Sequence, residues 1–357
     1  METNDMISAR QAFFHEGQLP SAAVRQPVLR SWLRCSDLGL AEQRPPALQP
    51  LTDSELRLLH QRHDALRRLC RPELEMLAGE ARDTMSVVVL ADGDGMILDT
   101  IGDAGFASRA AEVALRPGVS WKEASTGTNA IGTALAERRA IAVNGSEHFF
   151  PDHRVLSCAA TPIIDPRGAL IGALDLTGPS THGHGHALGL IRLAVDQIEH
   201  RLFRRHFQDC RLLRFHSDPA MLGTSREGIL VFREEGLVAG NRRGLSLAGL
   251  SWDALDDASF ETILSVEEPS RDGLLLRLSS GAYAVGQWNT DHAAARGSDL
   301  DLVARPVEPR PAMTREEREV AAIRAALSAH GGNVSKAARQ LGLHRSTIHR
   351  YRKQGLV

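Results

Sequence analysis

The last residues of the chain gather basic and hydrogen-bonding side chains at helical spacing. Residues 320–357 hold seven Arg or Lys and no Asp or Glu, whereas the whole chain has a formal net charge of −2. A basic terminal segment on an otherwise acidic chain is typical of DNA binding. The side chains expected to contact a double-stranded DNA operator are His344, Arg345, Ser346, Thr347, His349, Arg350, Arg352 and Lys353.

Helix start and stop signals predict how these side chains are positioned. Thr314 and Glu317 form a capping box before a run with apolar residues at helical spacing. Two glycines at 331–332 end that helix, and Asn333 can cap the next one. We therefore expect residues 314–357 to form an all-α helix-turn-helix with 344–353 as its recognition helix. A proline-rich linker at 306–313 precedes it.

This segment resembles the Fis-type helix-turn-helix at the end of bacterial enhancer-binding regulators. The matching residues are Asn333, Ala337, Ala338, Leu341, Gly342, Leu343, Arg345, Thr347 and Ile348. A basic helical hairpin that docks on a protein partner is the alternative interpretation.

A second set of residues in the middle of the chain has the chemistry of a small-molecule site. Its members are Trp121, Glu123, Thr128, Asn129, His148, Phe149 and Asp175. A helix that starts near Asn129 directs free backbone N–H groups at a ligand, the aromatic rings supply apolar walls, and the polar side chains supply orientation. The alternative is structural: Thr128 and Asn129 cap the helix, and Trp121 belongs to the core.

The elements around these residues predict an α+β architecture. Residues 1–85 read as a helical segment in which Pro72 restarts a helix. Alternating apolar residues from Ser86 onward predict antiparallel strands, with helices at 107–115, 129–137 and 187–206 and a loop at 116–128. The apolar stripe of the last helix either packs on its own sheet or forms a dimer contact; its residues are Leu188, Ile191, Val195, Ile198 and Leu202.

The region at 86–206 resembles a GAF domain of AcoR-like regulators, and the similarity extends over residues 25–205. The motifs that carry it are S-W-x-R-C at 31–35, G-x-x-W-x-E at 118–123, G-T-N-A-I-G-T-A-L at 127–135, E-H-F at 147–149 and G-x-L-D-L at 172–176. The resemblance implies a sensor for a small-molecule effector or a partner.

Residues 218–305 read as a further α+β unit, with strands at 227–232, 274–278, 283–288 and 300–304. They resemble a PAS domain through Gly228, Ile229, Gly236 and Asn241. The alternative is a plain packing or dimer domain. The predicted fold is therefore multidomain α+β: a GAF domain, a PAS-like α+β domain and a C-terminal all-α helix-turn-helix.

Several classes of function are disfavoured. The four cysteines form no C-x-x-C pair, which argues against a zinc site or disulfide scaffold. The alternating histidines at 182–186 read as a helix-start loop rather than a metal site. No catalytic constellation or cofactor motif is evident, so an enzyme is not expected. The polar N-terminus and the lack of a run of 18 apolar residues predict a cytoplasmic protein with no membrane span.

The AcoR-like family usually carries an AAA+ ATPase, and none is expected here. A Walker A loop needs a Gly-Lys pair, but Lys122, Lys336 and Lys353 each follow another residue type. We therefore expect a one-component regulator that binds its operator as a homodimer, responds to a small-molecule effector and contacts RNA polymerase. The alternatives are an antagonist that competes with a full-length sigma-54 activator for its DNA site, and a signalling scaffold whose tail binds protein.

Overall fold

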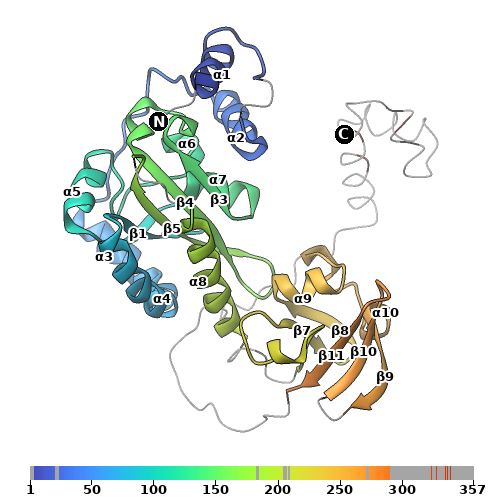
Figure 1. Cartoon of the computed structure of the whole chain (residues 1–357). Helices are drawn as coiled ribbons and strands as arrows, with labels where there is room; N and C mark the ends of the chain where they lie inside the picture. The colour runs from blue at the N-terminus through green and yellow to red at the C-terminus, as the bar shows by residue number, and fades with distance from the viewer. Residues whose placement is uncertain are drawn as a thin grey trace. The chain divides into compact units, whose positions relative to one another are not determined.

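The computed structural model (Figure 1) describes residues 4–20, 24–181, 185–203, 207, 210–270 and 273–289. Beyond these it describes Ile323, Leu327, Val334, Lys336 and Ala338. The chain divides into two units, 1–300 and 301–357. The α+β class is confirmed for the first unit, which contains both sheets.

The first sheet has five antiparallel strands in the order β2-β1-β5-β4-β3. They are β1 (Val87–Asp92), β2 (Ile97–Gly102), β3 (Ile141–Asn144), β4 (Leu156–Ile164) and β5 (Leu170–Pro179). The antiparallel strands expected from Ser86 onward are confirmed, and β1–β2 and β4–β5 each form a hairpin. In each turn an aspartate accepts backbone N–H groups: Asp92 from Asp94 and Met96, and Asp165 from Arg167 and Ala169.

Helices cover both faces of this sheet. On one face lie α5 (Ala104–Glu112), α6 (Glu123–Thr126) and α7 (Ala130–Glu137), and apolar residues of α5 and α7 share a core with Val87, Val89 and Ala173. The short α6 is a helix inside the segment predicted as a loop. The opposite face carries α4 (Asp64–Asp83) and α8 (Ala187–Leu202), and Leu66 of α4 approaches Gly172 there.

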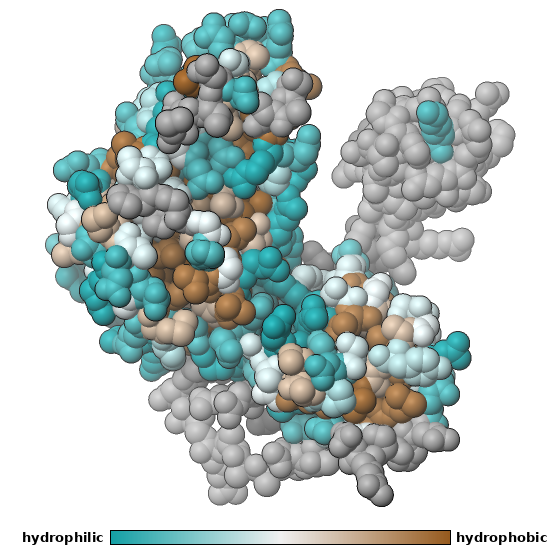
Figure 2. All heavy atoms as spheres, viewed as in Figure 1, coloured by the Kyte–Doolittle hydropathy of each residue, from teal (hydrophilic) through white to brown (hydrophobic). Residues whose placement is uncertain are grey.

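The apolar stripe of α8 packs within its own chain. Ile191, Val195, Ile198 and Leu202 are buried, and α8 contacts β4, β5 and α4. This stripe is therefore not the dimer contact that the sequence suggested as one alternative. The helix instead exposes Leu190 and Leu193, and Figure 2 shows hydrophobic atoms on the surface of the first sheet region.

Four helices precede the first sheet: α1 (Asn4–Phe14), α2 (Gln26–Asp37), α3 (Asp53–Arg62) and α4. A capping box begins α3 at Thr52, since its hydroxyl accepts from Glu55 N and the Glu55 carboxylate accepts from Thr52 N. The prediction that Pro72 restarts a helix is wrong, because α4 runs through it. Proline removes a backbone donor. The carbonyl that loses its helical donor is that of Arg68, and the neighbouring Leu69 carbonyl accepts from the Arg201 guanidinium at 2.7 Å.

The second sheet has six antiparallel strands in the order β8-β7-β6-β11-β10-β9. They are β6 (Arg211–His216), β7 (Gly228–Arg233), β8 (Gly236–Gly240), β9 (Leu264–Ser270), β10 (Gly273–Leu278) and β11 (Tyr283–Trp288). The sheet also carries α9 (Arg242–Leu247) and α10 (Phe260–Ile263). Strands β6 and β9 were not predicted, and β6 begins before residue 218. The strand expected at 300–304 lies outside the described residues.

Short 3-10 helices complete the first unit: Gly145–Glu147, Pro151–Val155, Pro219–Met221 and Trp252–Ala254. In the second unit, Ile323 and Leu327 are helical and buried. Val334, Lys336 and Ala338 are also helical, which agrees with the two helices expected there. None of the described helices is both long and apolar enough to cross a membrane.

The end of α8 joins three parts of the first unit. Consecutive residues form ion pairs with α9, with the segment before β7, and with α4. The pairs are Glu199–Arg242 at 2.7 Å, His200–Glu227 at 2.8 Å and Arg201–Glu73. Since Glu199 and Glu227 are buried carboxylates, this junction fixes the first sheet region to the second through charged groups that are largely removed from water.

Candidate functional site

The carboxylate of Glu123 bonds to other side chains of the chain. Glu123 begins α6 and is buried, and its two carboxylate oxygens accept from Arg34 Nε at 2.7 Å and Arg34 Nη2 at 2.8 Å. The Ser31 hydroxyl lies 2.6 Å from its Oε1. Ser31 and Arg34 belong to the upstream S-W-x-R-C motif. Two of the motifs that carry the family resemblance therefore meet in space, and they dock α2 onto α6 and α7.

Thr128 and Asn129 also serve the start of α7. The Asn129 side-chain oxygen accepts from Gly132 N at 2.8 Å, which is an N-cap. Its amide group donates to the carbonyls of Trp121 and Gly127 at 2.9 and 2.8 Å. Thr128 Oγ1 is 2.8 Å from the Ser31 hydroxyl. The hydrogen-bonding capacity of Asn129 is used within the chain, as the structural alternative for this residue expected.

The two predicted aromatic walls lie in different clusters. Trp121 belongs to the core between the first sheet and α5–α7, and its indole N–H donates to the Ala114 carbonyl at 3.0 Å. Phe149 belongs instead to the cluster of α1 and α2, where its ring contacts Phe14 edge-on at 5.0 Å between centroids. The structure thus separates Phe149 from Trp121, although both are buried.

A buried polar cluster lies on the face of the sheet that α5–α7 cover. Asp175 and Thr177 alternate on β5 and pair in register with Ala160 and Cys158 on β4. Thr177 Oγ1 donates to Asp175 Oδ2 at 2.5 Å, and Cys158 Sγ lies 3.5 Å from His148 Nε2. We call Asp175, Thr177, Cys158 and His148 the core polar cluster. It includes two of the predicted ligand-binding residues, His148 and Asp175.

Burial controls the charge of this cluster. It raises the pKa of Asp175 to about 7 and lowers the pKa of His148 to about 3. The pKa of Cys158 is raised well above its usual value for the same reason. Burial disfavours the charged form of each group, so His148 and Cys158 are neutral at pH 7 and Asp175 is protonated in a large fraction of molecules.

One oxygen of the cluster lacks a partner. Asp175 Oδ1 is buried and makes no hydrogen bond to any described residue. Buried polar atoms in folded proteins are nearly always hydrogen-bonded, so this oxygen has hydrogen-bonding capacity that the described residues leave unused. His153 lies near the cluster, with its ring 4.9 Å from Trp121 and 6.3 Å from His148, and its Nδ1 is also unpaired.

The sequence interpretation missed Thr177, Cys158 and His153 as members of this region. The period-two alternation of β4 and β5 contained the signal for the first two, because it places Cys158 and Thr177 on the face that carries Asp175. No comparable signal was available for His153, which lies in a short 3-10 helix.

The predicted DNA-contacting residues, 344–353, lie outside the described residues, as do His182 and His184 of the alternating histidine run. Among the residues that the structure describes, no three His, Cys, Asp or Glu side chains form a group that could hold a metal ion.

Family models match both ends of the chain. The model described as MimR, N-terminal domain, matches residues 2–200. The chain belongs to the MimR N-terminal domain family. The model described as Bacterial regulatory protein, Fis family, matches residues 314–354. The MimR N-terminal region therefore contains the first sheet with all of its helices, and a Fis-type segment follows later in the chain.

Relatives of this MimR-family chain include named transcriptional regulators, which confirms the predicted resemblance. The chain is 30% identical over 275 residues to the acetoin catabolism regulatory protein of Cupriavidus necator, covering 71% of this chain and 41% of that protein. It is 34% identical over 203 residues to the propane 2-monooxygenase operon transcriptional activator MimR of Mycolicibacterium smegmatis, covering 56% of this chain and 33% of that protein. The chain thus spans about two fifths or less of these relatives.

A solved structure, the E. coli DhaR(N)–DhaL complex, is similar to 68% of this chain and 83% of its own chain, with 17% identity and a TM-score of 0.48.

Proposed function

We propose that this protein is a DNA-binding transcriptional regulator that senses a small molecule through its first sheet region. The observation that carries the proposal is the Fis-family match over residues 314–354, in a segment whose charged residues are all basic from 320 onward. The match to the MimR N-terminal family places a region shared with transcriptional activators ahead of it.

Arg345 and Arg350 are the proposed base or phosphate contacts. A bidentate arginine–guanine contact contributes about 1–3 kcal/mol of discrimination. An operator is first selected from a genomic fragment library with the purified protein. Arg345→Ala should then weaken operator binding by at least about tenfold in a fluorescence-polarisation titration at physiological salt.

Arg324→Ala is the matched control, because it removes the same charge from the helix predicted to precede the recognition helix. It should weaken binding less than Arg345→Ala and leave the preference for the operator over random DNA unchanged. Equal losses in the two variants would show that only overall charge matters and would contradict the assignment of the recognition helix.

A helix-turn-helix offers few base contacts, so a specific operator usually contains two half-sites bound by a two-fold dimer. We propose that the protein binds as a homodimer through residues other than the buried α8 stripe, and that the bound protein contacts RNA polymerase. Light scattering of the full chain with and without a two-half-site operator tests the dimer.

The proposed effector site is the core polar cluster. Its groups favour a small uncharged ligand with a hydroxyl or carbonyl group, because a charged ligand would meet no compensating charge among buried neutral partners. Asp175 Oδ1 has unused hydrogen-bonding capacity, and a protonated carboxyl there can donate to a carbonyl. The named relatives regulate acetoin catabolism and a propane 2-monooxygenase operon, so acetoin and 2-propanol are the compounds to test first.

Calorimetric titration of acetoin and of 2-propanol into the full chain tests this site. Asp175→Asn should abolish or strongly weaken the binding of whichever compound binds. Asp83→Asn removes an exposed carboxylate at the end of α4 and should leave binding unchanged. Binding that survives Asp175→Asn would place the effector site elsewhere.

A further inference from the structure

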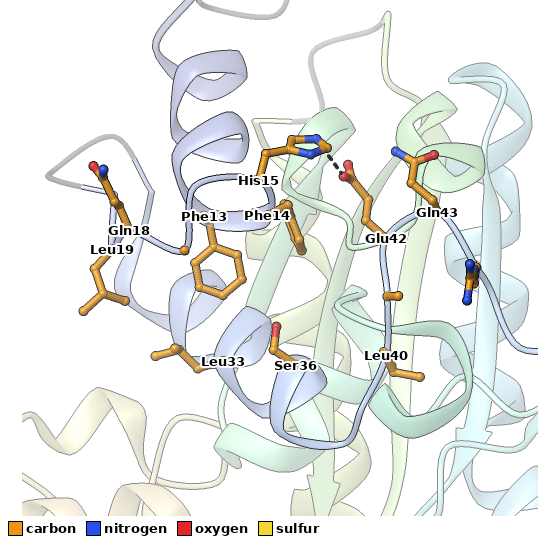
Figure 3. A pocket seen from close by; sticks show the side chains of 13 residues that line it. Phe13, Phe14, His15, Gln18, Leu19, Leu33, Ser36, Leu40, Glu42 and Gln43 are labelled. Atoms are coloured by element: carbon orange, nitrogen blue, oxygen red, sulfur yellow. Dashed lines mark ion pairs between the residues drawn. The ribbon is translucent and has the colours of Figure 1, made fainter.

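A separate cavity lies outside the first sheet, between α1 and α2. It has a volume of about 520 Å³, and residues 40–44 close one side of it (Figure 3). This volume is within the range of about 300–1,000 Å³ that is typical of small-molecule sites. None of its lining residues belongs to the core polar cluster or to the predicted ligand-binding set, so it is a different site from the proposed effector site.

The inner wall of this cavity is apolar and partly aromatic. Phe13 and Phe14 end α1, and Leu33 and Leu40 lie below them in Figure 3. The rings of Phe13 and Phe14 lie 5.3 and 5.0 Å from the ring of Trp32, which is fully buried. A rigid aromatic wall of this kind suits a ligand with a flat apolar body, which gains contact area at little entropic cost.

The charge around the cavity favours an anion. Glu42 is the carboxylate in the lining, and it is already paired with Arg10 at 2.5 Å and Arg154 at 2.8 Å. His15 lies at the rim, 3.6 Å from Glu42 (Figure 3). Arg44 also lines the cavity and forms no ion pair with the part of the chain that the structure describes. The carboxylate of the lining is thus already neutralised from outside the cavity, and a ligand carboxylate would find a partner in Arg44.

We propose that the α1–α2 cavity binds a small aryl or alkyl carboxylate, with its apolar body against Phe13 and Phe14 and its carboxylate toward Arg44 and His15. Occupancy acts on the segment that carries His148. Phe14 contacts the Phe149 ring, and Arg10 on the same helix donates to the carbonyls of residues 146, 148 and 149 at 2.7, 2.6 and 2.8 Å.

The test uses 3-phenylpropionate as the probe and its primary amide as the uncharged match, titrated into the full chain by ligand-observed NMR and calorimetry. The acid should bind, and the amide should bind more weakly. Ser36→Trp places a large side chain in the cavity from an exposed position of α2 and should weaken binding of the acid by at least about tenfold. Arg44→Gln should weaken the acid about fivefold and leave the amide unchanged.

Leu38→Trp is the matched control, because Leu38 is also exposed at the end of α2 but does not line the cavity. It should bind the acid like the unchanged protein. Thermal melts of both tryptophan variants establish that the fold is retained. No binding of the acid at millimolar concentration, equal binding of acid and amide, or equal binding by the Ser36→Trp and Leu38→Trp variants would each overturn the proposal.

Discussion

Asp175 provides the sharpest test of the core polar cluster. It lies in the middle of β5, is fully buried, and accepts one hydrogen bond, from Thr177. Replacement with Asn preserves the size of the side chain and an oxygen that can accept from Thr177, but removes the titration. The expected result is a change in how stability depends on pH rather than a uniform loss of stability.

The raised pKa of Asp175 sets the direction and the size of the change in the free energy of unfolding with pH. Burial raises the pKa of Asp175 from 3.8 to about 7 in the folded protein. Below pH 3.8 the carboxyl is protonated in both the folded and the unfolded state, so it does not lower the free energy of unfolding. As pH rises from 3.8 toward 7, the unfolded chain ionises first, and the folded state loses stability relative to it. One pKa unit corresponds to about 1.36 kcal/mol, so the full loss above pH 7 is about 4 kcal/mol.

The assay is urea unfolding of the full chain and of Asp175→Asn at a series of pH values from 4.5 to 8, with Asp83→Asn as the control. The free energy of unfolding of the Asn variant, relative to the unchanged protein, should rise by about 2–4 kcal/mol across that range. The control should show no such trend. If the free energy of unfolding differs between Asp175→Asn and the unchanged protein by the same amount at every pH, the assignment of a buried, protonatable carboxyl at this position is refuted.

Three further predictions follow from the packing. Burial lowers the pKa of His148 to about 3, so the folded protein loses stability as pH falls below about 6.5, where the unfolded chain takes up the proton. In the His148→Asn variant the urea midpoint should therefore fall less between pH 6.5 and 4 than in the unchanged protein. Arg242→Met leaves Glu199 buried without its cation and should destabilise the protein by about 3 kcal/mol in a thermal melt. Gly127→Ala would bring a Cβ within 2.4 Å of Phe149 Cβ at a φ of 63°, so the melting temperature should fall by several degrees, and an unchanged value would contradict this packing.

The elements that the sequence predicted well are those defined by local rules. The Asp92 and Asp165 turns, which join the strands expected from Ser86 onward, and the Asn129 cap each depend on a side chain that bonds to a backbone group within a few residues. The prediction at Pro72 failed because the local rule against proline inside a helix was overridden by distant contacts. Helix α4 packs on β1, β2 and α8 along its length, and this packing holds it helical through Pro72.

The candidate site was predicted only in part, because the residue types alone did not show which partners they meet. Glu123 and Asn129 have the chemistry of ligand contacts, yet their polar atoms bond within the chain. Phe149 follows His148 directly, but its side chain packs against α1 rather than facing the sheet. Strand β6 was missed for a related reason, since its short apolar run contributes the central strand of a sheet assembled from distant segments.

The segment around His148 connects the two sites that we propose. His148 contacts Cys158 in the core polar cluster, whereas the next residue, Phe149, contacts Phe14 at the α1–α2 cavity. Arg10 holds the backbone of this segment through three of its carbonyls. We therefore expect a ligand in one site that shifts this stretch of chain to affect the other site. Because binding free energies are reciprocal, each ligand that alters this segment must change the affinity of the other by the same factor.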